Sequence, residues 1–156
     1  EKAEISLCDR IFFLSPKEEK AGVNTSRFTE ECKDIRRTID RATERSLILM
    51  NESLSSTNPY DSCLLGEEVL RIFADIGCRL VFTTHIGELA ELAEKLNAGE
   101  VKSRMVSLVA LCDENGAPVY RIAEGKPDCA RNAQYIYGKF GISFEKYAAD
   151  KNRQQH

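Results

Sequence analysis

The sequence predicts an α/β fold: a parallel sheet flanked by helices, followed by an antiparallel hairpin and C-terminal helices. Uninterrupted apolar runs, such as residues 47–50, are typical of parallel strands covered on both faces. Amphipathic stretches separate these runs with short links, as in right-handed βαβ units. Asn115-Gly116, between two later strand-like runs, is a strong hairpin signal. These patterns predict a parallel part and then an antiparallel part.

The first strand and helix are predicted within residues 9–42. Residues 9–14 are aromatic and branched like a buried strand, and Ser15-Pro16 ends the run before a charged loop at 17–24. Thr25 or Ser26 can cap the helix that follows. Its apolar residues recur at helical spacing: Phe28, Cys32, Ile35, Ile39 and Ala42.

Charged residues cover the rest of this predicted helix. Glu30 and Glu31 suit the positive end of the helix dipole. Acids and bases three or four residues apart along residues 33–44 favour a solvated face over a binding surface.

A second unit of strand, loop and helix is predicted from residue 47 to Gly77. The apolar run 47–50 is followed by a loop at 53–61, and Asp61 or Ser62 caps the next helix. Gly77 closes that helix as a left-handed cap. The apolar stripe of the helix comprises Leu65, Val69, Ile72, Phe73 and Ile76.

A third strand and helix complete the parallel part. Residues 79–84 form a buried strand that leads directly into His85, and the next helix ends near residues 97–99. The apolar residues of that helix are Leu89, Leu92, Ala93 and Leu96.

The remaining residues predict the hairpin and two helices. The hairpin strands are residues 105–112 and 118–123. Asp128 can cap a helix that holds Ala133, Ile136 and Tyr137, and a last helix starts at Ser143 and ends in a frayed tail.

Composition excludes several classes of protein. The 156 residues carry a formal charge of −3, which argues against a surface that coats DNA. The six cysteines lie 15 or more residues apart without a C-x-x-C pair, which argues against zinc. With neither a secretory signal nor an apolar run near the 18 residues of a membrane span, we expect a cytoplasmic protein with reduced thiols and no membrane partner.

Candidate functional residues follow the predicted strands, because ligands of open α/β sheets bind at the carboxyl ends of strands. Asn51 with Glu52, the loop through Asp61, and His85 qualify. An acid after an apolar strand has the form of a Walker B element, which organises Mg²⁺ and the attacking water. Taken alone, each residue has a simpler interpretation: a solvated acid, a helix cap, or a loop histidine, and for Ser26 an N-cap.

Five ordered motifs make the pattern more specific. They are Asp9-Arg10-Ile11-Phe12, Ser26-x-Phe28, Leu49-Met50-Asn51-Glu52, Thr57-x-x-Tyr60-Asp61, and Thr84-His85-x-x-Glu88-Leu89. In this order they resemble the D-R-I-F strand, signature segment, Walker B strand, following loop and switch histidine of the MutS family of DNA mismatch-repair ATPases. The resemblance covers residues 1–145, as the C-terminal portion of a MutS-type ATPase domain, and leaves 146–156 as a helix end and tail.

The resemblance implies a P-loop NTPase fold of the ATP-binding-cassette type, with ATP and Mg²⁺ as cofactors. It implies that Glu52 is a general base or water-orienting carboxylate and that His85 hydrogen-bonds the γ-phosphate or the attacking water. Ser26 would contact the nucleotide of the partner subunit in a homodimer, and Asp61 would couple the two sites. DNA would be bound by other domains.

Two departures from the family pattern change these expectations. Asn51 occupies the position of the Mg²⁺-organising Asp; its amide oxygen can accept from metal-bound water but brings no charge, so metal affinity should be weaker. The sequence contains no G-x-x-x-x-G-K-[ST] and starts at Glu1. We therefore expect a fragment that begins after the phosphate-binding loop. Alone, it neither binds ATP tightly nor hydrolyses it, and it exposes strand edges and apolar surface that favour self-association.

Two functions from different classes follow. The first is part of an ATPase whose nucleotide cycle switches a DNA-bound dimer. The second is a non-catalytic dimerisation and signalling module of a divergent MutS-like protein, acting for example in control of recombination, in which Asn51 has replaced an acid that is no longer needed. A redox or metal protein built on the cysteines is a poor third, for the spacing reasons above.

Overall fold

The computed structural model describes residues 2, 4, 6–16, 26–114, 116–127 and 129–153. The chain divides into two compact units, residues 1–106 and 107–156. The predicted loop at 17–24, the alternative cap Thr25, and Asn115 and Asp128 lie outside the described residues. Together, the parallel sheet, the antiparallel pair and the helices make this an α/β chain, as predicted.

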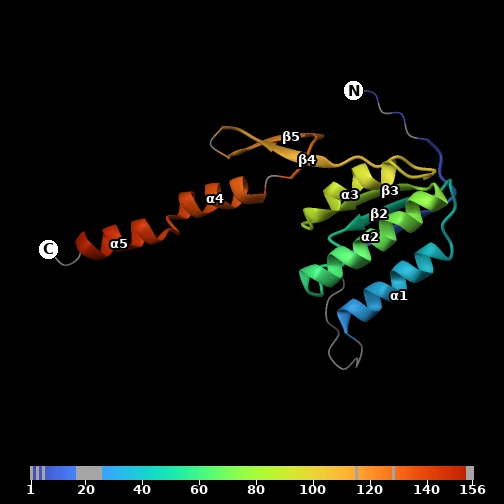
Figure 1. Ribbon diagram of the computed structural model, residues 1–156, viewed down its shortest axis with the longest axis horizontal. Helices are drawn as coiled ribbons and strands as arrows, with labels where there is room; N and C mark the ends of the chain where they lie inside the picture. Colours follow the sequence, from blue (N-terminus) through green and yellow to red (C-terminus); the bar gives the residue numbers. More distant parts are fainter. Residues whose placement is uncertain are drawn as a thin grey trace. The chain divides into compact units, whose positions relative to one another are not determined.

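The first unit is built on a three-stranded sheet of β1 (Ile11–Leu14), β2 (Leu47–Asn51) and β3 (Arg79–Thr83). The strand order is β1-β2-β3, and both pairs are parallel, with Ile48 level with Phe12 and Leu80. The helices are α1 (Arg27–Ile39), α2 (Pro59–Ile76) and α3 (Glu88–Asn97). Each strand is followed by a helix, which confirms the predicted βαβ pattern (Figure 1).

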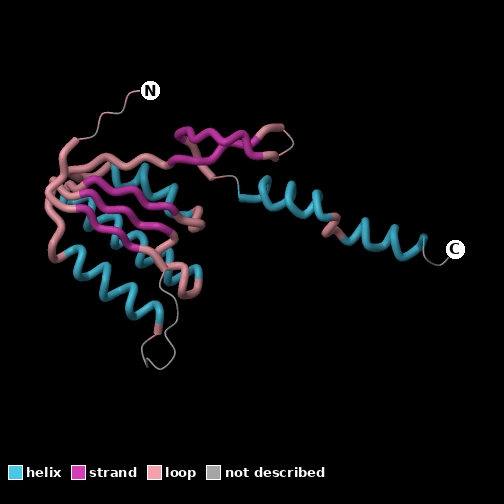
Figure 2. The backbone as a smooth tube through the Cα atoms, turned by 180° about the vertical axis from the view of Figure 1, so that it is seen from behind, coloured by secondary structure: helices cyan, strands magenta, loops and turns pink. Residues whose placement is uncertain are grey.

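The three helices pack on one face of this sheet. In Figure 2 the strands lie in front of the helices, and in Figure 1 α1 and α2 lie in front. Ile48 and Met50 of the central strand are fully covered by this layer, as is Phe73 of α2. A second cluster joins α2 to α3 and comprises Leu70, Leu89, Leu92 and Leu96. Alternation along each strand therefore sends every second side chain into one core.

The other face of the sheet is apolar and open in the first unit. Ile11, Phe13 and Val81 are 63%, 67% and 55% exposed, while Leu47 and Leu49 between them are half-buried. The prediction that run 47–50 is covered on both faces is therefore wrong for the described part of this unit. The physical reason is that α1, α2 and α3 all lie on the same side. The expected exposure of apolar surface is found here.

The ends of α1 follow the sequence signals. Ser26 is the N-cap, and its hydroxyl accepts a hydrogen bond from the Thr29 amide, as predicted. The helix ends at Ile39, so Ala42 of the predicted stripe lies beyond it, although it still packs against the core. Ion pairs three or four residues apart cover the solvated face, as predicted: Lys33–Glu30, Arg37–Asp34 and Arg36–Asp40.

The start of α2 differs from the prediction. Asn58 is the N-cap and Pro59 the first helical residue, so neither Asp61 nor Ser62 caps the helix, and residues 59–61 are helical rather than loop. Asn58 Oδ1 accepts from the Asp61 amide at 2.9 Å, and proline suits the first turn because its missing N–H has no helical partner there. Gly77 ends the helix with a positive φ of 84°, as predicted.

The second unit holds β4 (Leu108–Cys112), β5 (Pro118–Glu124), α4 (Cys129–Phe140) and α5 (Phe144–Arg153). The two strands are antiparallel, which confirms the hairpin. β4 begins at Leu108 rather than at Met105, because the Asn97 side chain of the first unit holds both the N–H and the C=O of Met105, at 2.8 and 2.7 Å. The last helix begins one residue after Ser143, the predicted start, and the Ser143 hydroxyl accepts from the Lys146 amide.

Asp9 fixes the chain where it enters the sheet. Its two carboxylate oxygens accept from the Thr43 hydroxyl at 2.6 Å and the Ser46 hydroxyl at 3.0 Å. The Asp9 amide donates to the Arg45 carbonyl. These bonds tie the residues before β1 to those before β2, and the hydrogen bond from Thr43 is the main cause that holds the pKa of Asp9 below its usual value.

Asp9→Asn is expected to lower the free energy of unfolding at pH 7. Because the pKa of Asp9 is lower in the folded state, its stabilisation is present above the unfolded value of about 4 and is lost as the pH falls through the folded value. The difference between the parent and the variant should therefore shrink between pH 5 and about pH 2, as measured by urea unfolding across that range. Asp75→Asn, an exposed change in α2, is the control. A difference that does not change with pH would contradict the prediction.

Phe73→Ala is expected to lower the free energy of unfolding by about 3–5 kcal/mol, because it leaves a cavity in the core under the sheet. Urea unfolding of the chain measures it. Leu64→Ala removes a half-exposed side chain of the same helix and should cost less than about 1 kcal/mol. Equal losses for the two variants would show that the helical layer is not the core.

Candidate functional site

The candidate site lies at the carboxyl ends of β2 and β3. Asn51 ends β2 opposite Thr83, which ends β3, and the Glu52 amide continues the ladder by donating to the Thr83 carbonyl at 2.8 Å. His85 follows two residues after Thr83, in the link to α3. Parallel pairing therefore brings three of the predicted site residues, Asn51, Glu52 and His85, to one edge of the sheet.

Glu52 and His85 form a direct contact. His85 Nε2 lies 3.0 Å from Glu52 Oε1, and the two side chains are 85% and 49% exposed. An ionised carboxylate can only accept, so Nε2 is the ring nitrogen that carries the hydrogen when Glu52 is charged. The pair is therefore open to solvent. The sequence separation of 33 residues is bridged entirely by the β2–β3 pairing.

Thr83 orients the side chain of Asn51. Its hydroxyl donates to Asn51 Oδ1 at 2.7 Å. An amide oxygen has two lone pairs, so Oδ1 can accept a second hydrogen bond. Sequence reasoning used Thr83 only as part of a strand; its position opposite Asn51 in the parallel register is the signal that would have found it.

The turn after β2 has an unusual backbone. Glu52 has φ of 49° and Leu54 has φ of 72°, and neither is glycine. Left-handed conformations of such residues cost on the order of 1 kcal/mol or more each, so the surroundings must hold them. The Leu54 side chain is completely buried in the core, and the Leu54 carbonyl accepts from the Ser62 hydroxyl at 2.6 Å.

Glu31 of α1 also holds this turn, through hydrogen bonds to its side chain. Its carboxylate is buried, with the residue only 4% exposed. Glu31 Oε2 accepts from the Leu54 amide at 3.1 Å and from the Ser56 hydroxyl at 3.0 Å. Sequence reasoning assigned Glu31 to the helix dipole and missed this contact. Its spacing from Ile35 and Thr38, which are also buried, is the signal that could have drawn attention to it.

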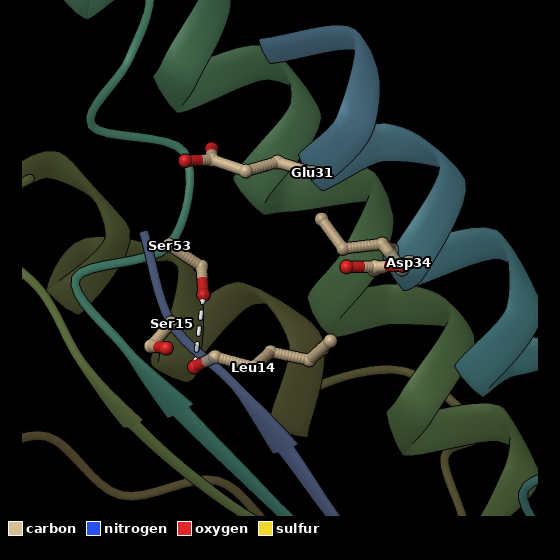
Figure 3. Close-up of a pocket in the computed structure, with 6 residues that line it drawn as sticks. Leu14, Ser15, Glu31, Asp34 and Ser53 are labelled. Atoms are coloured by element: carbon tan, nitrogen blue, oxygen red, sulfur yellow. Dashed lines mark hydrogen bonds between the residues drawn. The ribbon is translucent and has the colours of Figure 1, made fainter. Parts of the chain in front are cut away.

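Figure 3 shows the Glu31 side chain reaching from α1 to the turn, while the Ser53 side chain points to Leu14. The Ser53 hydroxyl donates to the Leu14 carbonyl at 3.3 Å, so the turn is also bonded to the end of β1. The other oxygen of Glu31, Oε1, is buried without a hydrogen-bond partner among the described residues. The small pocket there is lined by Leu14, Ser15, Glu31, Asp34, Ile35 and Ser53.

Ser26 and Asp61, the other two predicted site residues, lie at helix starts. Ser26 is exposed, and its hydroxyl also lies 2.8 Å from the Thr29 hydroxyl. Asp61 lies in the first turn of α2, where its Oδ2 accepts from the Asn58 amide group at 2.6 Å. Within the described ranges, neither side chain has a hydrogen bond or ion pair with Glu52 or His85. The roles that the resemblance implies for them remain predictions.

The cysteines whose side chains the structure describes are free thiols. Cys8, Cys32, Cys63, Cys78 and Cys112 are free, and burial raises the pKa of the Cys32, Cys63 and Cys78 thiols. Cys78 packs in the core, as a small apolar residue does. Among residues that the structure describes, there is no cluster of three metal-ligating side chains, and no helix has the length and apolar character to cross a membrane.

A comparison with known protein families shows which family this chain belongs to. The sequence profile of MutS domain V matches residues 1–132. The chain belongs to the MutS domain V family. All five motifs lie within the matched residues, including the strand ends that carry Glu52 and His85.

Individual proteins that resemble this chain are also members of the MutS family. The DNA mismatch repair protein MutS of Brevibacillus brevis is 32% identical over 131 residues, which are 81% of this chain and 14% of that protein. The Aquifex pyrophilus protein of the same name is 29% identical over 147 residues, 94% of this chain and 16% of the relative. Endonuclease MutS2 of Caldanaerobacter subterraneus is 29% identical over 145 residues, 93% of this chain and 18% of the relative. The chain thus spans less than a fifth of the length of these relatives.

A double-mutant cycle is expected to give a coupling free energy below about 1 kcal/mol for the Glu52–His85 pair, because both side chains are solvent-exposed. The variants are Glu52→Ala, His85→Ala and the double variant, measured by urea unfolding. The Glu67–Arg71 pair on the surface of α2 serves as the control cycle. A coupling of several kcal/mol would show that the pair is a structural element rather than an open site.

Proposed function

We propose that this chain supplies the hydrolytic side of an ATP site in a MutS-type ATPase of the P-loop NTPase fold. The observation that carries the proposal is the 3.0 Å contact between Glu52 and His85 at neighbouring strand ends of a MutS domain V chain. The 156 residues contain no G-x-x-x-x-G-K-[ST]. The proposal therefore requires a phosphate-binding loop from outside these residues, where backbone N–H groups and a lysine would bind the phosphates.

Glu52 is proposed as the group that accepts a proton from, or orients, the attacking water. One of its oxygens, Oε1, is held by His85 Nε2, and Oε2 has no hydrogen bond to the residues that the structure describes. The carboxylate is thereby oriented at one oxygen and available at the other. General bases act within hydrogen-bond distance of the proton they take, and such an open oxygen meets that requirement for a bound water.

His85 is proposed to report the nucleotide state. It is a weakly held ring on an exposed link, and its contact with Glu52 is one that a phosphate oxygen can replace, because both are anionic acceptors for Nε2–H. When the ring turns toward a phosphate, Glu52 Oε1 loses its hydrogen bond and becomes a second free acceptor beside Oε2. Phosphate binding and activation of the base are then linked by one hydrogen bond.

Asn51 is the residue that would meet the Mg²⁺ that accompanies ATP. Its amide oxygen accepts one hydrogen bond from Thr83 and retains a second lone pair, which suits a metal-bound water. Mg²⁺ keeps several waters in such sites, so a contact through water fits its chemistry. Bound metal would supply charge neutralisation at the phosphates. Because Asn51 carries no negative charge, we propose weak metal binding.

We further propose a homodimer in which Ser26 of one subunit approaches the nucleotide of the other. Ser26 presents a hydroxyl at the exposed N-terminus of a 13-residue helix, where backbone N–H groups favour an anion. Asp61, in the first turn of α2, would couple the two sites. The relatives are named DNA mismatch repair proteins. DNA is proposed to bind elsewhere in the protein, since this chain carries a charge of −3.

A second candidate is a dimerisation and signalling module that does not hydrolyse ATP. The observation that favours it is Asn51, because the amide contributes no negative charge beside Glu52 and its oxygen already accepts from Thr83. In this case Glu52 and His85 would be remnants of a hydrolytic site. The two candidates differ in a single measurable property, which is turnover that depends on Glu52.

Glu52→Gln is expected to reduce kcat for ATP hydrolysis by about 10²–10⁴-fold while leaving nucleotide affinity within a few-fold, because it removes a general base but not a phosphate ligand. The measurement is steady-state phosphate release with Mg²⁺, in a protein that carries residues 1–156 together with a G-x-x-x-x-G-K-[ST] loop. Nucleotide binding is measured separately by calorimetry.

Glu91→Gln, on the exposed surface of α3, is the control and should keep full turnover. Turnover that does not change in Glu52→Gln would reject the hydrolytic role. Dimers that form without nucleotide, combined with no turnover in the parent protein, would support the signalling module instead.

A further inference from the structure

We infer that Glu31 is a positioning residue for Glu52, and that it links the turn after β2 to α1 so that the helix start at Ser26 and the carboxylate of Glu52 move together. The inference rests on the proposed function for the identity of Glu52 as the reacting group. It goes beyond that function by assigning a role to a side chain with no direct part in the site.

The link consists of two hydrogen bonds to one buried oxygen. Glu31 Oε2 accepts from the Leu54 amide and the Ser56 hydroxyl, at 3.1 and 3.0 Å, across 23 and 25 residues of sequence. The hydrogen bond from the Leu54 amide fixes the backbone two residues after Glu52. Since the side chain of Leu54 is completely buried, this N–H is out of reach of water, and without Glu31 it would lack a partner.

The backbone that this link holds is strained. The positive φ angles of Glu52 and Leu54 lie on either side of Ser53, so the chain turns sharply just where the carboxylate leaves the sheet. If the turn relaxed to ordinary angles, the direction of the Glu52 side chain would change. His85 would then lose its 3.0 Å contact, because that ring lies in the link after β3 and would not move with the turn.

Burial of the Glu31 carboxylate is not what stability alone favours. Burying a carboxylate costs free energy unless its oxygens are fully hydrogen-bonded, and Oε1 has no hydrogen-bond partner in the described part of the chain. One carboxylate oxygen can, however, accept two hydrogen bonds through its two lone pairs, as Oε2 does. The geometry is suited to holding a turn rather than to filling a core.

The same helix carries Ser26. Glu31 lies five positions after Ser26, which is about 7.5 Å along the axis of an α-helix. Because the helix is rigid over that distance, a displacement of its exposed N-terminus by a ligand or partner reaches the turn through Glu31. A movement at Ser26 can thus alter the orientation of Glu52 without any direct contact between the two.

The test uses the 156-residue chain and nuclear magnetic resonance, with Glu31→Ala, Glu31→Gln, Glu52→Ala and the double variant Glu31→Ala/Glu52→Ala. The readouts are the ring resonances of His85 and hydrogen exchange of the Leu54 amide. We expect Glu31→Ala to speed exchange at Leu54 by about tenfold or more, since the amide loses its acceptor. It should also shift the His85 resonances in the direction given by Glu52→Ala, which removes the acceptor altogether.

Two comparisons separate positioning from general destabilisation. In the Glu52→Ala background, Glu31→Ala should move His85 no further, because the contact it positions is already lost. Glu31→Gln keeps an acceptor for the Leu54 amide and should restore both readouts at least in part. Ile35→Ala removes a buried side chain one turn further along α1 and is the matched control, which should leave His85 at its parent position.

His85 resonances that stay unchanged in Glu31→Ala would overturn the inference, as would an equal shift in Ile35→Ala. If Glu31→Ala does not fold, Ser56→Ala removes one of the two bonds and should shift the same signals by a smaller amount; no shift there also counts against it. These results do not depend on ATP. Failure of the proposed function appears instead as turnover that is insensitive to Glu52→Gln.

Discussion

The parallel pairing of β2 with β3 is the constraint on which the site depends. It sets Asn51 opposite Thr83 and extends by one further hydrogen bond, from the Glu52 amide to the Thr83 carbonyl. A slip of one residue in this register would reverse which side chains enter the core, so the burial of Ile48 and Met50 enforces the same alignment that brings Glu52 to His85. The hydrophobic core and the polar contact are therefore two consequences of a single register, and a change to one disturbs the other.

The turn after β2 shows how this chain combines stability with strain. Leu54 contributes a buried side chain to the core while its backbone adopts a left-handed conformation that leucine avoids. Bonds from Ser62 to the Leu54 carbonyl and from the Leu54 amide to Glu31 hold it there. The energy released by packing and hydrogen bonding elsewhere in the unit maintains a geometry at Glu52 that the local sequence would not adopt. This is the arrangement expected where the direction of one side chain matters more than local stability.

Sequence reasoning succeeded where the signal is local. Ser26 as a cap, Gly77 as a left-handed stop and the hairpin around Gly116 each follow from a few adjacent residues, and so does the assignment of the apolar run before Asn51 to a parallel strand. It failed where a side chain bonds to residues far away in the sequence, and where two residues could each cap the same helix. Glu31 has ordinary helix-start chemistry, and its real partners lie 23 and 25 residues away. Asp61 and Asn58 are both good caps, and Pro59 decides between them by starting the helix earlier. Coverage of the sheet on both faces depends on where helices pack, which strand composition does not encode.

The exposure of the Glu52–His85 pair has a consequence for any hydrolytic role. Catalytic carboxylates and imidazoles act most strongly where water other than the reactant is excluded, because electrostatic interactions gain strength in a low-dielectric site. His85 is 85% exposed, and the described residues of the first unit do not shield it. If the pair hydrolyses ATP, further protein must close over it, and the nucleotide itself must fill much of the space. The open sheet face with Ile11, Phe13 and Val81 supports the same conclusion, since exposed apolar patches of this kind commonly mark surfaces that bind other protein. The chemistry proposed for Glu52 thus requires an assembly, and the hydrogen bond with His85 keeps the carboxylate oriented until that assembly forms.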